Sequence, residues 1–495
     1  MDARRRSTSG ETHVLPSRTA IDAARSKLLT TLPDNGLGSD LVGEHVRNDI
    51  VPGLNRSSQS PNYYGFVTGG ATPAAASADN VVTQTDQNVS VHLPNETVAT
   101  DVEDRALGMI CELLDLDREQ WPHRTFTTGA TASNVLGLAC GREYVLRAAR
   151  KSNKDGKVAS VAEYGIVEAV KMAGLTSIQV LTTVPHSSLR KAASIVGLGR
   201  ASVIDVGRPE QPHVFDLASL ESHLQVPGTG SIVAVSCAEV NTGLFATDGQ
   251  TMASIRALCD KYGAWLHVDA AFGLLTRVLP QAQEYTTLNA GVAGLELADS
   301  ITGDAHKLIN VPYDCGILLS KHLDLGIDVF QNPNAAYLNT AASGSIPSVN
   351  RTVPSPLSIG IENSRRFRAL PVYATLAAYG RTGYCEMLER QIALARGIAR
   401  HMLHSDAYDL LPRSTSENVE DRLQNIYIIV LFRAKDDQLN TSLVERINAT
   451  RDIHVSPTQW DGQGAVRIAI ANWQVDVERD LQLVKRVLTQ AAEPC

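Results

Sequence analysis

The sequence lacks the cysteine patterns of zinc and redox sites. It contains seven cysteines, and no two of them have the close C-x-x-C spacing that such sites use. Their number is odd, and no apolar segment of a secretory signal peptide is recognised. Because disulfides persist in oxidising compartments, we expect reduced thiols and a cytoplasmic protein.

Long apolar runs and an excess of positive charge are also missing. No apolar run approaches the ~20 residues that span a bilayer. The 45 Lys and Arg residues are outnumbered by 53 Asp and Glu residues, whereas nucleic-acid binding needs basic side chains to neutralise phosphates. The only basic cluster, Arg4–Arg6, is more typical of a solvated terminus than of a targeting segment. We expect neither a membrane nor a nucleic acid as a partner.

Several familiar catalytic motifs are absent. There is no P-loop, and the glycine pairs at Gly197-Leu-Gly199 and Gly228-Thr-Gly230 lack the third glycine of a dinucleotide site. Neither G-x-S-x-G nor H-E-x-x-H occurs. The chemistry must therefore come from other polar residues.

The middle of the chain alternates between short apolar runs and helical patterns. The predicted strands are 177–183, 231–237, 264–269 and 315–320, and the predicted helices include 133–149 and 252–262. This alternation is typical of buried parallel strands joined by helices. We predict an α/β domain over 101–370, preceded by a partly helical segment, 1–100, and followed by a small α+β domain, 371–495.

Two segments of the predicted α/β domain suggest contacts with a ligand. Small residues between Phe126 and Asn134 run into a helical pattern, so their N–H groups form either a phosphate site or an ordinary Ser/Thr helix cap. Taken alone, the cap is favoured. His186 follows an apolar strand, where its ring could stack on a planar ligand, although a lone histidine is more often structural.

Two further segments supply charged groups. Asp269 ends a buried strand, which is unfavourable unless the carboxylate has a partner, and Ala270 and Ala271 leave room for something flat beside it. Lys307 lies between an apolar segment and the strand that starts at Cys315. A desolvated lysine amine is a nucleophile toward an aldehyde.

Together these four weak signals fit one cofactor, pyridoxal 5′-phosphate (PLP). PLP needs a lysine for its aldehyde, a carboxylate for its pyridine nitrogen and hydrogen-bond donors for its phosphate. It also gains from a flat group that stacks on its ring. The sequence offers one candidate for each requirement.

The ordered motifs then resemble a known family. They are GATASN, PHSS, HVDAAFG, DAHK, NAAYL, RRFRALP and VRIAIANW. This series is similar to the group II PLP-dependent decarboxylases, which include the aromatic-amino-acid, histidine and glutamate decarboxylases, over roughly residues 55–480. The resemblance implies the PLP-dependent transferase fold type I of aspartate aminotransferase, with a mostly parallel seven-stranded sheet. It also implies a homodimer with the active site at the subunit interface, in which segment 1–100 packs on the partner.

The resemblance also implies how the cofactor is held. Lys307 forms the Schiff base with PLP, Asp269 keeps the pyridine nitrogen protonated, His186 stacks over the ring and Ala271 packs on its other face. Further cofactor contacts are assigned to Ala130, Thr131, His306 and Asn241. In place of the family's Asn-Pro-His-Lys this chain has Asp304-Ala-His-Lys, and an Asp in contact with the phosphate would repel it.

The activity implied is removal of the α-carboxylate of an L-amino acid, giving an amine and CO2. Tyr337 is expected to protonate Cα after CO2 leaves, and substrate contacts are assigned to Phe66, Thr68, His186 and Arg467. An oxidative deaminase or aldehyde synthase on the same fold is the alternative, and the presence of Tyr337 favours decarboxylation. The sequence does not decide which amino acid is the substrate.

Overall fold

The computed structural model describes residues 13–149, 158–332, 353–414, 416 and 418–493, which form two compact units. One unit, called here the small unit, comprises the described residues up to Thr68, Arg390–Val419 and those from Ile428 onward. The other, called the large unit, comprises Gly69–Glu389 and Glu420–Tyr427. The structure thus divides the chain elsewhere than after residues 100 and 370, and the sequence-based domain assignment stays a prediction.

The large unit is built on a seven-stranded sheet with the strand order β1-β9-β8-β7-β6-β2-β3. Its strands are β1 (His123–Thr127), β2 (Ser177–Thr182), β3 (Val203–Asp205), β6 (Thr229–Ser236), β7 (Trp265–Asp269), β8 (Ser300–Asp304) and β9 (Gly316–Ser320). Strands β3, β2, β6, β7 and β8 pair in parallel, which confirms the predicted mostly parallel sheet.

Strand β9 departs from the prediction that the apolar runs form parallel strands. It pairs antiparallel with both β8 and β1. Between β8 and β9 lies only the short helix α11 (Ala305–Leu308) with its flanking turns, and a parallel pairing needs a longer crossover. The reversal makes β1 run in the same direction as β8.

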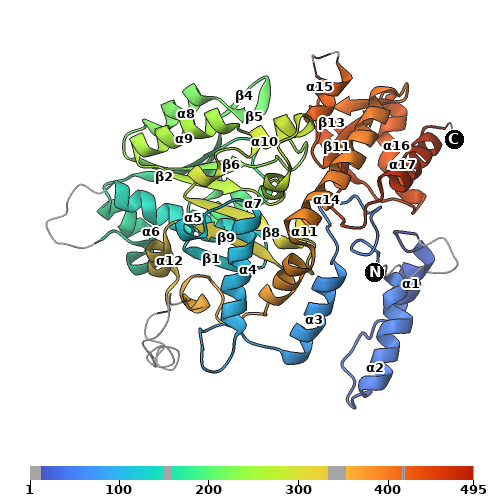
Figure 1. Cartoon of the computed structure of the whole chain (residues 1–495), viewed down its shortest axis with the longest axis horizontal. Helices are drawn as coiled ribbons and strands as arrows, with labels where there is room; N and C mark the ends of the chain where they lie inside the picture. Colours follow the sequence, from blue (N-terminus) through green and yellow to red (C-terminus); the bar gives the residue numbers. More distant parts are fainter. Residues whose placement is uncertain (1–12, 150–157, 333–352, 415, 417, 494–495) are drawn as a thin grey trace. The chain divides into compact units, whose positions relative to one another are not determined.

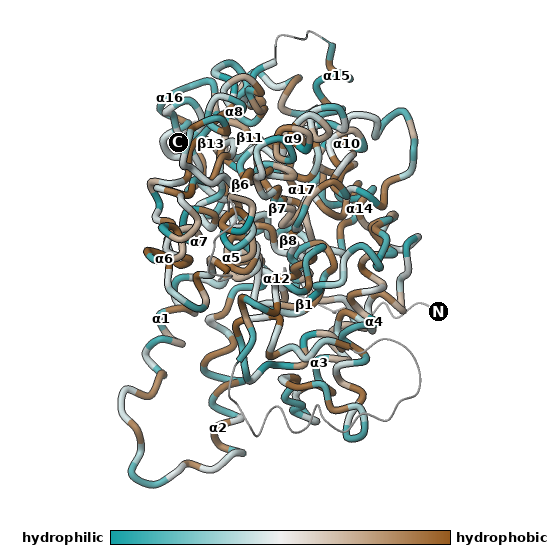
Figure 2. The backbone as a smooth tube through the Cα atoms, turned by 90° about the vertical axis from the view of Figure 1, so that its left-hand side faces the viewer, coloured by the Kyte–Doolittle hydropathy of each residue, from teal (hydrophilic) through white to brown (hydrophobic). Residues whose placement is uncertain are grey.

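The helices of the large unit are α3 (Pro73–Thr85), α4 (Ala99–Leu113), α5 (Ala130–Ala148), α6 (Val161–Met172), α7 (Ser187–Ile195), α8 (Leu217–Leu224), α9 (Gly249–Tyr262), α10 (Thr286–Gly291) and α12 (Leu323–Phe330). Among them, α4, α5, α7, α8 and α9 pack against strands of the sheet. Helices α8 and α9 lie side by side (Figure 1). The central strands β6 and β7 are buried along almost their whole length and run through hydrophobic segments (Figure 2), as expected for strands covered on both faces.

Helix α5 lies unusually close to β7. A Cβ atom built on Gly137 would lie 2.6 Å from the ring of His267, and one on Gly141 would lie 2.8 Å from Trp265. Glycine at these two positions therefore lets the helix approach the strand. The approach brings the first turns of α5 next to the end of β7, where Asp269 lies.

The small unit contains a four-stranded antiparallel sheet in the order β10-β11-β13-β12. Its strands are β10 (Tyr408–Leu411), β11 (Ile429–Ala434), β12 (Ser456–Trp460) and β13 (Gln463–Ala469), and its helices are α1 (Arg18–Lys27), α2 (Ser39–His45), α16 (Asp437–Ala449) and α17 (Val477–Ala492). Helix α14 (Ala369–Leu403) contributes residues to both units. A two-stranded ribbon, β4 (Gly207–Arg208) and β5 (Gln211–Phe215), and helix α15 (Val419–Gln424) complete the elements. Within the described part of the chain, no helix is both long and apolar enough to cross a bilayer.

Candidate active site

A cavity of about 320 Å³ lies in the large unit at one edge of the sheet. Its lining residues follow the carboxyl ends of five strands: Thr128–Ala132 after β1, His186 after β2, Ala238 after β6, Asp269 on β7, and Lys307 after β8. Ligands of open α/β sheets bind outside the carboxyl ends of the strands. The topology therefore brings together residues that lie far apart in the sequence.

Asp269 is held by neutral hydrogen-bond donors. Its Oδ2 accepts a hydrogen bond from Nδ2 of Asn134 at 2.9 Å, and its Oδ1 accepts one from the N–H of Ala271 at 3.3 Å. Among the described residues, no Lys, Arg or His forms an ion pair with it. Its negative charge is thus oriented but not neutralised, which suits a partner that arrives with a ligand.

His186 is fixed by the first turn of α7. Its Nδ1 lies 2.6 Å from Oγ of Ser188 and also accepts a hydrogen bond from the Ser188 N–H at 3.3 Å. Because Nδ1 is the acceptor here, the ring proton lies on Nε2. The imidazole is therefore neutral and held at the cavity wall.

Lys307 and Asp304 form an ion pair at the cavity. Nζ of Lys307 lies 2.7 Å from Oδ2 of Asp304 and 5.9 Å from the ring centroid of Phe272. The Asp304 side chain is only 3% exposed. Its Oδ1 accepts a hydrogen bond from the N–H of Ala130 at 2.6 Å, so both oxygens of this carboxylate are engaged.

The start of α5 excludes one of the two alternatives for the segment before Asn134. The residue preceding the helix is Gly129, with φ 154°, and it makes no side-chain cap. A Ser/Thr cap, favoured for the segment taken alone, is therefore wrong. The Asp304 carboxylate accepts one of the helix's N-terminal N–H groups instead, and Ala130 and Thr131 both line the cavity, where such groups favour an anion.

His306 also lines the cavity in its neutral form. Burial lowers the pKa of His306 below its ordinary value. Its Nδ1 accepts a hydrogen bond from the N–H of Cys315 at 3.2 Å, and its ring lies 4.6 Å from that of Tyr313. The proton of the ring is thus on Nε2, where it can be donated to an anion.

Not every predicted site residue lines this cavity. Asn241 does not, and its N–H donates to Oε1 of Glu239 at 2.8 Å, whereas the neighbouring Val240 does. The assignment of Asn241 as a cofactor contact therefore stays a prediction.

Three of the four predicted substrate contacts, Phe66, Thr68 and Arg467, lie in the small unit, whereas His186 lines the cavity of the large unit. Nη1 of Arg467 donates to the carbonyl of Phe66 at 2.6 Å, and Oγ1 of Thr68 donates to the carbonyl of Gly65 at 3.1 Å. Arg467 is thus bonded to a segment far away in the sequence, and the contact of these residues with a substrate stays a prediction. Tyr337 lies outside the described residues.

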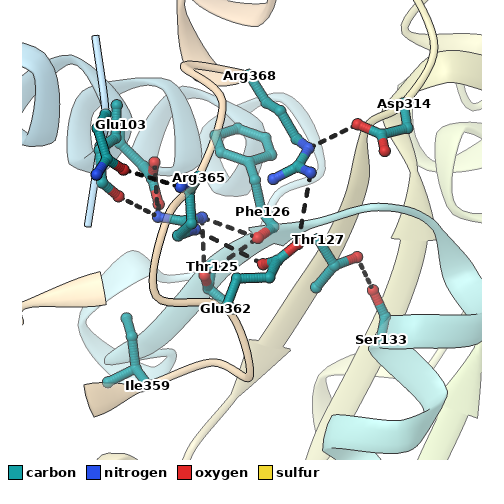
Figure 3. A network of polar contacts seen from close by, with 12 residues as sticks. Glu103, Thr125, Phe126, Thr127, Ser133, Asp314, Ile359, Glu362, Arg365 and Arg368 are labelled. Carbon is teal, nitrogen blue, oxygen red and sulfur yellow. Dashed lines mark hydrogen bonds and ion pairs between the residues drawn. The ribbon is translucent and has the colours of Figure 1, made fainter. Parts of the chain in front are cut away.

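A buried network supports the strand that leads into the site (Figure 3). Arg365 pairs with Glu103 at 3.0 Å and donates to the carbonyl of Phe126, on β1, at 2.9 Å. Arg368 pairs with Asp314 at 2.7 Å, on the segment between α11 and β9. The RRFRALP motif therefore braces β1 and the chain beyond Lys307 rather than lining the cavity.

Three further residues at the site belong to the sequence motifs, although no role was predicted for them. Phe272 belongs to HVDAAFG, Asn134 ends GATASN and Ser188 ends PHSS. Phe272 and Ser188 line the cavity, and Asn134 contacts Asp269. Their roles depend on which face of a helix or strand they occupy, which the spacing alone does not fix.

The groups that line the cavity are those that PLP requires. They are the Lys307 amine, the Asp269 carboxylate without a paired cation, the flat ring of His186 and the start of the 19-residue helix α5. Asp304 is the one feature of the described lining that opposes a phosphate, because it places a negative charge on the first N–H of that helix.

The comparisons with known proteins agree with this chemistry. Residues 23–421 match the model of the pyridoxal-dependent decarboxylase conserved domain. An L-2,4-diaminobutyrate decarboxylase of Acinetobacter baumannii is 28% identical over 377 residues, 74% of this chain and 68% of that protein. A phenylacetaldehyde synthase of Arabidopsis thaliana is 24% identical over 458 residues, 88% of this chain and 83% of that protein.

A solved structure shows the same fold. The crystal structure of Oryza sativa TDC with PLP and tryptamine superposes with a TM-score of 0.77 at 20% identity, covering 97% of this chain and 92% of that one. Together with the family match over most of the chain, this confirms fold type I. The chain belongs to the pyridoxal-dependent decarboxylase family, whose members are carboxy-lyases that use PLP.

Proposed function

We propose that this chain removes the α-carboxylate of an L-amino acid, using PLP linked to Lys307, and releases an amine and CO2. The observation that carries the proposal is the single cavity that holds Lys307, Asp269, His186 and the start of α5. The family match supports decarboxylation of an amino acid in general. The particular amino acid is not part of the proposal, since the similar proteins differ in the substrates that their names give.

When bound, PLP supplies an electron-accepting ring that stabilises the negative charge left at Cα as CO2 departs. The residues of the chain would hold that ring in place. The Lys307 amine would carry the cofactor, and the Asp269 carboxylate would hold a proton on the ring nitrogen by its charge. His186 and Ala271 would pack on the ring, while the start of α5 at Ala130, the N–H of Thr131 and Nε2 of His306 would favour the phosphate.

Asp269 contributes most where water is excluded. A charge acts more strongly in a site of low dielectric constant, and this carboxylate is already oriented by Asn134 and Ala271. The Oη of Tyr337 delivers the proton to Cα in this proposal, and the sequence places it in the segment that resembles the mobile loop of the family.

The cofactor link is tested by reducing the purified holoenzyme with borohydride and mapping the labelled peptide. We expect the label at Lys307, and its loss in Lys307→Ala. A label at any other lysine would overturn the assignment. Screening the common amino acids for amine and CO2 formation then identifies the substrate.

An aldehyde synthase is the second candidate function, because the similar protein of Arabidopsis thaliana is a phenylacetaldehyde synthase. It would yield an aldehyde, ammonia and H2O2 in place of the amine. The tyrosine at position 337 favours decarboxylation. Quantifying amine against H2O2 for the same substrate separates the two activities.

We also propose a cytoplasmic homodimer. The small unit exposes apolar side chains on and around α1 and α2, among them Leu29, Leu32, Leu41 and Leu54, each more than half exposed. A second copy of the chain is a suitable cover for such a surface. The six described cysteines are free thiols, as expected in a reducing compartment. Light scattering of the purified holoenzyme tests the assembly, and a monomer would contradict it.

A further inference from the structure

Asn134 is a buried amide that reaches two residues of the cavity. Its side chain is 0% exposed, on the second turn of α5. Its Nδ2 donates to Oδ2 of Asp269 at 2.9 Å and to Oγ of Ser188 at 3.3 Å. Both hydrogens of the amide are therefore used, and both point toward the cavity wall.

The oxygen of the same amide is held from the opposite side. Oδ1 of Asn134 accepts hydrogen bonds from Nε2 of His267 at 2.9 Å and from Oγ1 of Thr302 at 3.3 Å. An ionised carboxylate only accepts hydrogen bonds, so the amide cannot turn over without losing its bond to Asp269. The orientation of Asn134 is thus determined by its neighbours.

His267 links Asn134 to residues deeper in the core. Burial lowers the pKa of His267 to about 4, so the ring is neutral at physiological pH. Since its Nε2 proton goes to Asn134, its Nδ1 accepts from Oγ of Ser300 at 2.7 Å. The Ser300 Oγ in turn accepts from Nε1 of Trp265 at 3.0 Å, and an indole N–H is a donor only.

The geometry of β7 explains why this chain of bonds ends at Asp269. Trp265, His267 and Asp269 are alternate residues of one strand, and alternate side chains of a strand share a face. That face is the one that α5 approaches through Gly137 and Gly141. From Trp265 through Ser300, His267 and Asn134 to Asp269, each group donates to the next one. The donor or acceptor role of each group in this series is therefore determined.

The second branch of the network reaches His186. Nδ1 of His186 accepts from the Ser188 N–H, so it carries no proton, and the Ser188 hydroxyl 2.6 Å away donates to it as well. The oxygen of the same hydroxyl accepts from Nδ2 of Asn134. One amide thus contacts both the Asp269 carboxylate and the serine that holds His186.

We infer that Asn134 is a positioning residue that holds the Asp269 carboxylate and, through Ser188, the His186 ring for the cofactor. The inference rests on the proposed placement of PLP against these two residues. A network that served only the stability of the core would need no link to the half-buried end of β7 at the cavity.

The test compares Asn134→Leu with wild type in cofactor-free protein. Leucine has a similar volume and cannot hydrogen-bond, so Asp269 and Ser188 lose a donor. We expect the dissociation constant of PLP, measured by fluorescence titration, to rise about tenfold, as loss of a hydrogen bond to a charged group implies. The absorption spectrum of the bound cofactor should also change its pH dependence.

Ser133→Ala is the matched control. Ser133 is the neighbouring buried residue of α5, and its Oγ bonds to Oγ of Thr127 at 2.7 Å without contact to Asp269 (Figure 3). Both variants should lower the melting temperature of the cofactor-free protein. Only Asn134→Leu should weaken PLP binding. Equal PLP dissociation constants in the two variants and wild type would show that Asn134 is merely structural.

Asn134→Asp tests the same point if the leucine variant does not fold. A protonated carboxyl at 134 can donate to Asp269 as the amide does, whereas an ionised one cannot. The titratable groups that face this position are Asp269 and His267 directly, and His186 through Ser188. The variant has one more group that loses a proton as the pH rises, and loss of that proton removes the hydrogen bond to Asp269. Its PLP affinity should therefore fall with rising pH relative to wild type. A pH profile parallel to wild type would overturn the inference.

The borohydride experiment separates this inference from the proposed function. A label on Lys307 in wild type together with unchanged PLP affinity in both Asn134 variants refutes only the role of Asn134. A label on another lysine refutes the placement of the cofactor itself.

Discussion

Two carboxylates of the same cavity are held in opposite ways. Asp269 receives hydrogen bonds from neutral donors, the Asn134 amide and the Ala271 N–H, and forms no ion pair within the described residues. Asp304 is paired with Lys307 and accepts the first N–H of α5. The first charge is oriented for an incoming ligand, whereas the second is already satisfied by the protein.

The difference shows that burial and proximity do not determine the role of an acid. Both residues end a parallel strand, β7 or β8, and both line the cavity. What separates them is the partner, since a carboxylate held by neutral dipoles keeps its charge available and one held by an ammonium group does not. Three changes test this contrast.

The largest effect is expected from Asp269→Asn. The amide keeps the shape but removes the charge that we propose faces the cofactor's ring nitrogen, so turnover should fall about a thousandfold, the scale of one electrostatic contact in a closed site. The rate of amine formation at saturating substrate measures it. Asp248→Asn, at the exposed cap of α9, is the control and should leave the rate unchanged. A rate for Asp269→Asn within a few-fold of wild type would remove the basis of the comparison.

A smaller effect concerns the network behind Asp269. His267 has a pKa of about 4 in the folded protein and an ordinary value of 6.5. As the pH falls, His267 is protonated in the unfolded chain at a higher pH than in the folded protein. The stability that neutral His267 provides is therefore fully present above pH 6.5 and is lost as the pH falls toward 4. In His267→Gln this loss is absent. The difference in free energy of unfolding between variant and wild type should shrink by about 2 kcal/mol from pH 7.5 to pH 4.5 in denaturant titrations. If the difference in free energy of unfolding were the same at both pH values, the pKa of His267 would not differ between the folded and unfolded states.

The smallest effect is expected from Asp304→Asn. Asparagine can still accept from the Ala130 N–H, but it removes the negative charge next to the proposed phosphate site. The dissociation constant of PLP should fall about tenfold, while that of pyridoxal, which lacks the phosphate, should change less. Titrating the cofactor-free protein with both compounds measures this. Equal changes for the two ligands would mean that Asp304 acts through Lys307 rather than against the phosphate.

Much of the site was predictable because its residues end predictable elements. Asp269 and Lys307 follow apolar runs with clear β character, and the small-residue segment before Asn134 precedes a strong helical pattern. Such local patterns reflect which backbone groups and faces are buried, so the fold class and the cofactor could be predicted from them. The family match confirms both.

Other features could not be read from the chain. The antiparallel course of β9 depends on how short its connection to β8 is. The loop after β6 places Val240 in the cavity lining, whereas the contact assigned to Asn241 stays a prediction. Each of these depends on the direction in which the chain leaves an element, which a run of residue types does not specify.

The sequence by itself determined the kinds of group available: an amine, two acids, flat rings and a helix start, in the order of a known family. Only the tertiary structure decided that Asp304 forms an ion pair with Lys307, while Asp269 receives hydrogen bonds from neutral donors. The physical reason is that an ion pair or a directed hydrogen bond depends on distances of about 3 Å between residues far apart in the chain, and only the packed sheet and helices set those distances.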